Sequence, residues 1–136
     1  MTADSTSPEE RLARVLVVDD DARVRRALCA LLRSSPGLCV AGEAASGPAT
    51  LRADEELRPD VVLLDILLPS ADDGLAVLDR LAAKGRAVVA LSVREGLRPA
   101  VMAAGAAGFV DKYSGPDALL ATLVEVLART GGRGCG

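Results

Sequence analysis

Hydrophobic and polar positions follow two rhythms along the chain, and the two alternate five times. Short runs of aliphatic residues are typical of buried strands, whereas apolar residues that return every three or four positions are typical of helices. The pattern predicts strands at residues 15–18, 38–44, 61–64, 88–91 and 109–110. It predicts helices at residues 22–33, 47–57, about 74–84 and about 100–104, and a last helix that ends near Arg129.

This alternation of strands and helices indicates the fold class. Strands separated by helices form βαβ units, which assemble into a parallel sheet with helices on both faces. Because the crossovers are right-handed, the helices are distributed over the two faces of one open sheet. We therefore expect an α/β protein with a doubly wound five-stranded parallel sheet. Ligands of such sheets bind at the carboxyl ends of the strands.

The residues best suited to chemistry come directly after predicted strands. They are Asp19, Asp20 and Asp21 after the first strand, Asp65 after the third, Ser92 after the fourth and Lys112 after the fifth. Carboxylates that share one crevice repel each other, and a hard divalent cation relieves that repulsion. A lysine and a hydroxyl beside the cation can hold phosphate oxygens. The sequence thus predicts a site for Mg²⁺ (or Mn²⁺) and a phosphoryl group.

Four segments, VLVVDDDARVRRAL, PDVVLLDILLP, VVALSV and GAAGFVDK, resemble the signature blocks of response-regulator receiver domains. The resemblance covers residues 14–129 and is strongest to receivers that are attached to helix-turn-helix DNA-binding domains. It implies the flavodoxin-like (βα)5 receiver fold with strand order 2-1-3-4-5. The spacing of the elements alone would not give this strand order.

The resemblance also implies a role for each matching residue. Asp65 would accept the phosphoryl group, and Lys112 and Ser92 would contact it. Phe109 would be the switch aromatic. The metal ligands implied are Asp19, Asp20, Asp65 and the backbone carbonyl of Leu67.

As a receiver, the chain would take a phosphoryl group from a sensor histidine kinase and dimerise on phosphorylation. It would be no enzyme beyond its own phosphorylation and dephosphorylation, and it would control transcription through an output domain that these residues do not contain. The net charge of −3 and the pI near 5.0 give no basic surface for direct contact with nucleic acid. Three cysteines without a signal peptide favour a reducing compartment, so we expect a cytoplasmic protein that does not contact a membrane.

The expected organisation is a disordered segment at residues 1–12, a receiver domain at 13–130, and a flexible tail or the start of a linker at 131–136. The sequence leaves open whether the chain is a fragment of a regulator or a stand-alone receiver. Two stretches depart from the usual family spacing. Gly74 follows Asp65 by nine positions, about one more than expected, and only thirteen positions separate Ser92 from Gly105, which predicts a short or late-starting fourth helix.

Two other functions are compatible with part of the pattern. Phosphatases of the haloacid-dehalogenase type place an aspartate nucleophile and a second acid two positions later after the first strand, as Asp19 and Asp21 are placed here. That interpretation leaves Asp65 unexplained, and the chain is short for a substrate cap. A degenerate receiver that acts by protein binding alone is the other alternative, although the complete set of acids disfavours it.

Overall fold

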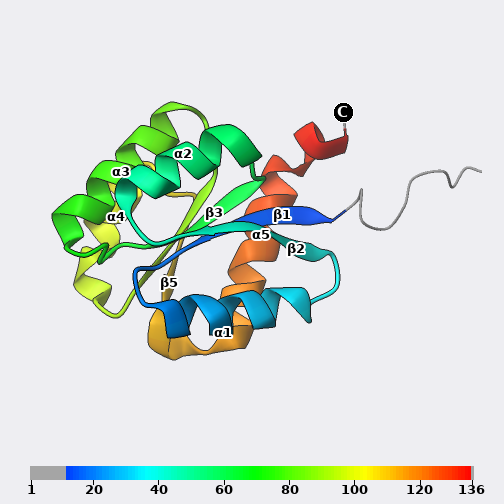
Figure 1. Cartoon of the computed structure of the whole chain (residues 1–136), viewed down its shortest axis with the longest axis horizontal. Coiled ribbons are helices and arrows are strands. Elements are labelled where there is room, and N and C mark those ends of the chain that lie inside the picture. Colours follow the sequence, from blue (N-terminus) through cyan, green and yellow to red (C-terminus); the bar gives the residue numbers. More distant parts are fainter. Residues whose placement is uncertain (1–11, 136) are drawn as a thin grey trace, which may run out of the picture.

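The computed structural model of the protein describes residues 12–135, so the expectation for residues 1–11 lies outside the described part of the chain. Strands and helices alternate throughout (Figure 1). The strands are β1 (Ala13–Val18), β2 (Leu38–Ala44), β3 (Val61–Asp65), β4 (Val88–Ser92) and β5 (Gly108–Asp111). The α-helices are α1 (Ala22–Arg33), α2 (Gly47–Leu57), α3 (Ala71–Ala83), α4 (Arg98–Ala103) and α5 (Pro116–Cys135), with short 3₁₀ turns at Glu95–Leu97 and Lys112–Ser114.

All five strands form one parallel sheet in the order β2-β1-β3-β4-β5. Helices α1 and α5 lie on one face of the sheet, and α2, α3 and α4 lie on the other (Figure 1). The doubly wound α/β fold and the strand order 2-1-3-4-5 are therefore confirmed. The carboxyl ends of all the strands lie at one edge, which is where the candidate site residues were expected.

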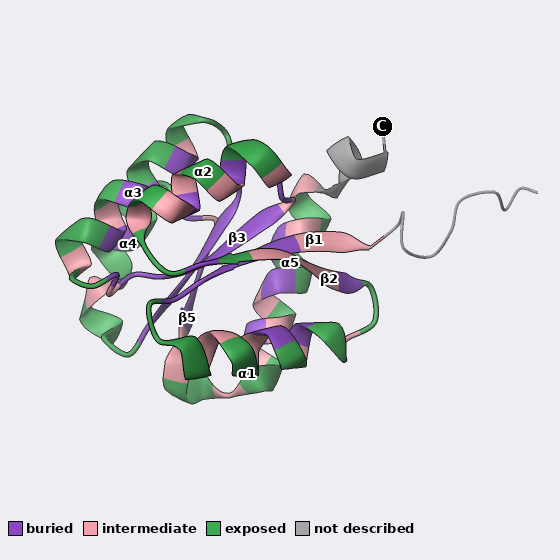
Figure 2. Ribbon diagram, viewed as in Figure 1, coloured by how far each residue is buried: buried purple, intermediate pink, exposed green. Residues whose placement is uncertain are grey.

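The sheet is buried on both faces along its central strands, which explains their unbroken hydrophobic runs (Figure 2). In β1, Leu16 and Val18 pack toward α2, α3 and α4, whereas Val15 and Val17 pack toward α1 and α5. All four of these side chains are fully buried. The sheet thus separates two hydrophobic cores and leaves only its edges for polar chemistry.

Helices α1 and α2 begin and end where the sequence predicts. The Asp21 carboxylate caps α1 by accepting hydrogen bonds from the backbone N–H groups of Arg23 and Val24. The Ser46 hydroxyl caps α2 in the same way, and Pro48 occupies its first turn. These local signals fixed both starts.

The predicted start of α3 near Gly74 is wrong, because the helix begins three residues earlier. Ser70 caps it by accepting a hydrogen bond from the backbone N–H of Asp73 at 3.2 Å, and Asp72 and Asp73 are favourable in a first turn. The loop after Asp65 therefore comprises only residues 66–70.

Helix α4 has six residues, which confirms the short fourth helix expected from the spacing. Helix α5 extends to Cys135, past the predicted end near Arg129. No proline follows Pro116 to interrupt it. In the part of the chain described, no helix has the length and hydrophobicity needed to cross a bilayer.

Candidate functional site

Three aspartates meet at the carboxyl edge of the sheet. Asp19 and Asp20 follow β1 directly, and Asp65 is the last residue of the neighbouring strand β3. One carboxylate oxygen from each of the three lies within 4.8 Å of the others. Asp19 and Asp65 are 1% and 4% exposed, whereas Asp20 is open to solvent. We call these three residues the acid cluster.

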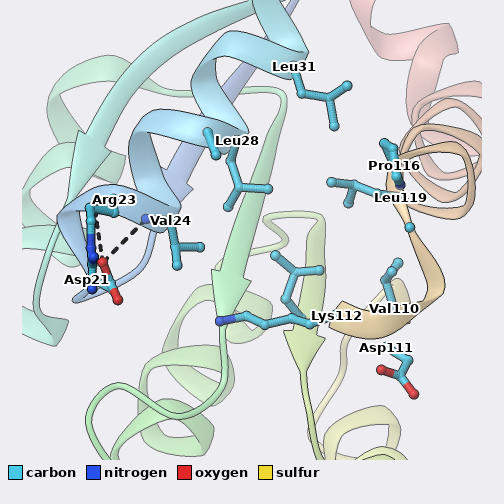
Figure 3. Close-up of a pocket in the computed structure, with 13 residues that line it drawn as sticks. Asp21, Arg23, Val24, Leu28, Leu31, Val110, Asp111, Lys112, Pro116 and Leu119 are labelled. Carbon is cyan, nitrogen blue, oxygen red and sulfur yellow. Dashed lines mark hydrogen bonds between the residues drawn. The ribbon is translucent and has the colours of Figure 1, made fainter.

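Lys112 supplies the positive charge of the site. Its side chain extends from the end of β5 toward the middle of the sheet edge (Figure 3). The ammonium group donates a hydrogen bond to Asp19 Oδ2 at 3.0 Å and lies 3.2 Å from Asp65 Oδ2. Burial alone would lower the pKa of Lys112, but its hydrogen bond to Asp19 and the negative charges of Asp65 and Asp19 raise it. The lysine is therefore held as a cation between two carboxylates.

The pKa of Asp65 is raised from 3.8 to about 6. Burial is the largest cause, and the charge of Asp19 acts in the same direction. Attraction to Lys112 and the hydrogen bond from the backbone N–H of Leu67 oppose this shift without cancelling it. Asp65 is thus a carboxylate that is costly to ionise and that a further cation would stabilise.

The donor set fits a hard divalent cation. Three carboxylates face one ammonium group, which leaves the cluster with an excess of negative charge when all are ionised. Mg²⁺ and Mn²⁺ both accept oxygen ligands of this kind. Leu67 lies next to this cluster, because its backbone N–H donates a hydrogen bond to Asp65 Oδ1 at 3.1 Å.

Ser92 and Phe109 lie on β4 and β5 and have partners other than the acid cluster. Ser92 is fully buried at the end of β4, and its hydroxyl oxygen accepts a hydrogen bond from the backbone N–H of Arg94 at 2.9 Å. The Phe109 ring is 6% exposed and packs in the core beneath α2, α3 and α4. The guanidinium carbon of Arg98 lies 4.6 Å from the centre of that ring. Of the side chains expected at the site, the described structure brings Asp19, Asp20, Asp65 and Lys112 together and leaves Ser92 and Phe109 with other partners.

The sequence missed Arg25, although it touches the site. This residue lies in the first turn of α1 and donates a hydrogen bond to the backbone carbonyl of Asp19 at 2.8 Å. No sequence signal could have shown this contact, because arginines on helices usually point to solvent. Asp21, in turn, belongs to the cap of α1, and the hydrogen bonds from Arg23 and Val24 lower its pKa.

A cavity of about 800 Å³ opens between α1 and α5, beside the lysine (Figure 3). Its walls are largely aliphatic and include Leu28 and Leu31 from α1 and Leu119 from α5. Lys112 and Asp21 line the end nearest the acid cluster. The site therefore adjoins an apolar groove through which another molecule could approach.

Fold and site together define a parallel α/β module with an acidic pocket for a cation at the carboxyl edge of its sheet. The response regulator receiver domain family matches residues 15–124 of this chain. The chain therefore belongs to this family, whose domains act in two-component signalling.

Proteins of similar sequence include a methylesterase and a response regulator. The chain is 37% identical over 115 residues to a protein-glutamate methylesterase/protein-glutamine glutaminase of Halalkalibacterium halodurans. It is 38% identical over 120 residues to the response regulator GacA of Pseudomonas viridiflava. These matches cover 81% and 85% of this chain but only 33% and 54% of the two relatives. The chain thus spans about a third to a half of the length of these proteins.

Among solved structures, a LuxR-family two-component response regulator from Aurantimonas sp. SI85-9A1 superposes with a TM-score of 0.80 at 28% identity. The superposition covers 86% of each chain. It supports the receiver fold over nearly the whole described part of this protein.

Proposed function

We propose that this domain accepts a phosphoryl group on Asp65 from the phosphohistidine of a sensor histidine kinase. The observation that carries the proposal is the pairing of a nearly buried Asp65 with Lys112 inside the acid cluster. A carboxylate held there can attack, and the lysine lies where charge on a transferring phosphoryl group has to be neutralised.

In the transfer step, one oxygen of the Asp65 carboxylate attacks phosphorus, a new P–O bond forms and the P–N bond to the donor imidazole breaks. The product is an acyl phosphate, and later attack by water releases inorganic phosphate and restores the carboxylate. Lys112 balances charge on the phosphoryl oxygens from its position 3.2 Å from Asp65. Asp19, Asp20, Asp65 and the Leu67 carbonyl would hold Mg²⁺ or Mn²⁺, which when bound neutralises further charge on those oxygens.

Ser92 and Phe109 are the proposed responders to this step. Among the described residues, the Ser92 hydroxyl accepts a hydrogen bond from the N–H of Arg94 and donates none, so it can donate its proton to a phosphoryl oxygen. Movement of the β4–α4 loop that follows would alter the packing of α4, whose Arg98 covers the Phe109 ring. The change of charge at Asp65 would thereby shift the conformational equilibrium of the α4–β5 region.

The groove between α1 and α5 is the proposed contact surface for the donor protein. It is largely aliphatic, and its Lys112 end adjoins the acid cluster. A donor seated there could present its phosphohistidine to Asp65 from the open side of the sheet edge.

The output of the full protein is proposed to be control of transcription by a domain outside these residues, with activity in the cytoplasm and dimerisation on phosphorylation. GacA and the LuxR-family neighbour support a regulatory output. The alternative phosphatase would need Asp19 as its nucleophile. It would leave the nearly buried Asp65 and its contact with Lys112 without a role, so this alternative has less support.

Intact-mass measurement after incubation with acetyl phosphate and Mg²⁺ tests the proposal. The wild-type protein should gain the mass of one phosphoryl group, and Asp65→Asn should gain none. Asp79→Asn, an exposed aspartate on α3, is the control and should be labelled like the wild type. Labelling that persists in Asp65→Asn and disappears in Asp19→Asn would favour the phosphatase instead. Sizing of the labelled sample tests the proposed dimer.

A further inference from the structure

Arg25 joins three elements next to the acid cluster. It lies in α1, and its side chain is 19% exposed. One terminal nitrogen of its guanidinium group donates to the backbone carbonyl of Asp19 at 2.8 Å. Its Nε donates to the carboxylate of Glu43, in β2, at 3.2 Å. Arg25 therefore ties the loop after β1 both to its own helix and to the edge strand of the sheet.

The bond to the Asp19 carbonyl completes the fixation of that residue. The backbone N–H of Asp19 donates to the carbonyl of Ala44 at 3.2 Å. Its carboxylate accepts from the backbone N–H of Asp21 at 2.9 Å and from Lys112 at 3.0 Å. Every polar group of Asp19 thus has a partner, and among the described residues Arg25 provides the hydrogen bond to its carbonyl.

That carbonyl belongs to the peptide group that leads into Asp20. Because a peptide group is planar, fixing the carbonyl of Asp19 also fixes the N–H of Asp20 and the position of the Asp20 Cα atom. The Asp20 side chain is exposed, and its carboxylate has no hydrogen bond or ion pair among the described residues. Its position in the acid cluster therefore depends on how its backbone is held.

We propose that Arg25 is a positioning residue for the cation site: it orients the Asp19–Asp20 peptide group and so places the Asp20 carboxylate opposite Asp65. The inference rests on the proposed metal-dependent function. Replacing a side chain that hydrogen-bonds to a metal ligand without contacting the metal commonly changes metal affinity by about 10- to 100-fold.

The sign of the effect separates positioning from simple electrostatics. Arg25 carries a positive charge close to a cation site, so loss of that charge alone would strengthen cation binding. Loss of positioning would weaken it. Arg26 is a matched control, because it is the next residue on α1, is exposed, and its side chain makes no hydrogen bond or ion pair in the described part of the chain.

Calorimetric titration with Mg²⁺ at neutral pH is the test, on the wild-type protein and on Arg25→Met, Arg25→Lys and Arg26→Met. We expect Arg25→Met to weaken Mg²⁺ binding about tenfold. Arg25→Lys should lose less, because its ammonium group can reach one of the two acceptors but lacks the planar fork. The Mg²⁺ affinity of Arg26→Met should lie within about twofold of the wild-type value, since this change removes a charge but no side-chain hydrogen bond.

Thermal unfolding of each variant in the presence of a chelator shows whether the fold is kept. Unchanged or tighter Mg²⁺ binding by a folded Arg25→Met would overturn the inference and leave Arg25 a structural contact. If Arg25→Met does not fold, Arg25→Lys decides in the same way. Failure of the wild-type protein itself to bind Mg²⁺ would overturn both this inference and the proposed function.

Discussion

Asp65 is a residue on which burial and ion pairing act in opposite directions. Burial raises its pKa, Lys112 lowers it, and the value of about 6 shows that burial is the larger effect. The folded protein therefore spends free energy to keep Asp65 ionised at neutral pH. A group that is costly in the resting protein and useful for chemistry is typical of a functional site.

This cost predicts that Asp65→Asn stabilises the protein in the absence of metal. The folded pKa lies above the unfolded one, so the folded state binds more protons between pH 3.8 and about 6, and the wild type loses stability as pH rises through that window. At neutral pH the variant should be more stable by roughly 1–3 kcal/mol, and near pH 3 the difference should vanish. Urea unfolding at a series of pH values, with a chelator present, measures it.

Asp79→Asn is the control for this comparison, because Asp79 is exposed on α3 and should show no such pH-dependent gain. An Asp65→Asn variant that is less stable than the wild type at neutral pH would show that the ion pair with Lys112 outweighs burial.

The sequence predicted the members of the acid cluster and Lys112 because each follows a strand, and parallel strands place their carboxyl ends at one edge. It could not predict that Lys112 contacts both Asp19 and Asp65, or that Arg25 holds the carbonyl of Asp19. Those contacts depend on rotamers and on how α1 sits against β2, which no local pattern encodes.

At the scale of elements, the packing of α3 against the loop after β3 depends on Gly74. A Cβ atom at this position would lie 1.7 Å from the backbone carbonyl oxygen of Ile66, which is far inside van der Waals contact. A backbone atom cannot move aside as the end of a side chain can. The close approach of helix and loop therefore requires a residue without a side chain.

We predict that Gly74→Ala lowers the free energy of unfolding by about 3 kcal/mol or more, because the helix has to shift away from the loop that carries Leu67. Urea unfolding checks the value. Gly96→Ala is the control, since a Cβ at Gly96 meets nothing within 4 Å. Equal stability of the two variants would mean that α3 can move at little cost.

The starts of α1 and α2 were predictable, because acidic residues precede α1 and Gly47 and Pro48 open α2. The start of α3 was missed because Gly74 suggested a boundary, whereas Ser70 is the actual cap. A glycine that a close contact requires is indistinguishable, in the sequence alone, from a glycine that ends a loop.

At the scale of the whole molecule, the carboxyl ends and the amino ends of the parallel strands carry separate charged clusters. Away from the acid cluster, the fully buried Asp54 of α2 lies 2.5 Å from Arg86 Nε and 3.0 Å from Lys84 Nζ. The contact with Lys84 is close enough for an ion pair, although it is not aligned as a hydrogen bond. Arg86 also donates to the carbonyl of Pro59 at 2.8 Å, so this cluster joins α2 to the segments that lead into β3 and β4.

Removal of the buried carboxylate should therefore destabilise the fold without affecting the candidate site. Asp54→Ala leaves Arg86 without its partner and should cost about 3–5 kcal/mol in urea unfolding. Mg²⁺ affinity of the folded variant, measured by calorimetry, should equal that of the wild type. Glu55→Ala, at an exposed neighbouring position, should change neither quantity. A loss of Mg²⁺ affinity in Asp54→Ala as well would show that the Asp54 cluster and the acid cluster are coupled.

The alternation of elements was enough to predict a doubly wound parallel sheet, but the order of its strands came from the family resemblance. Several orders satisfy right-handed crossovers equally well, and only side-chain packing between particular strands selects among them.

Tyr113 directly follows Lys112, is 82% exposed, and is the single tyrosine of a chain without tryptophan. Its backbone N–H is anchored to the Asp111 carboxylate at 2.8 Å, so the ring projects into water from a fixed base. Tyrosine fluorescence of this protein consequently originates from one residue, which is bonded directly to the lysine. The protein carries a built-in optical probe, and titrations can be followed without attaching a dye.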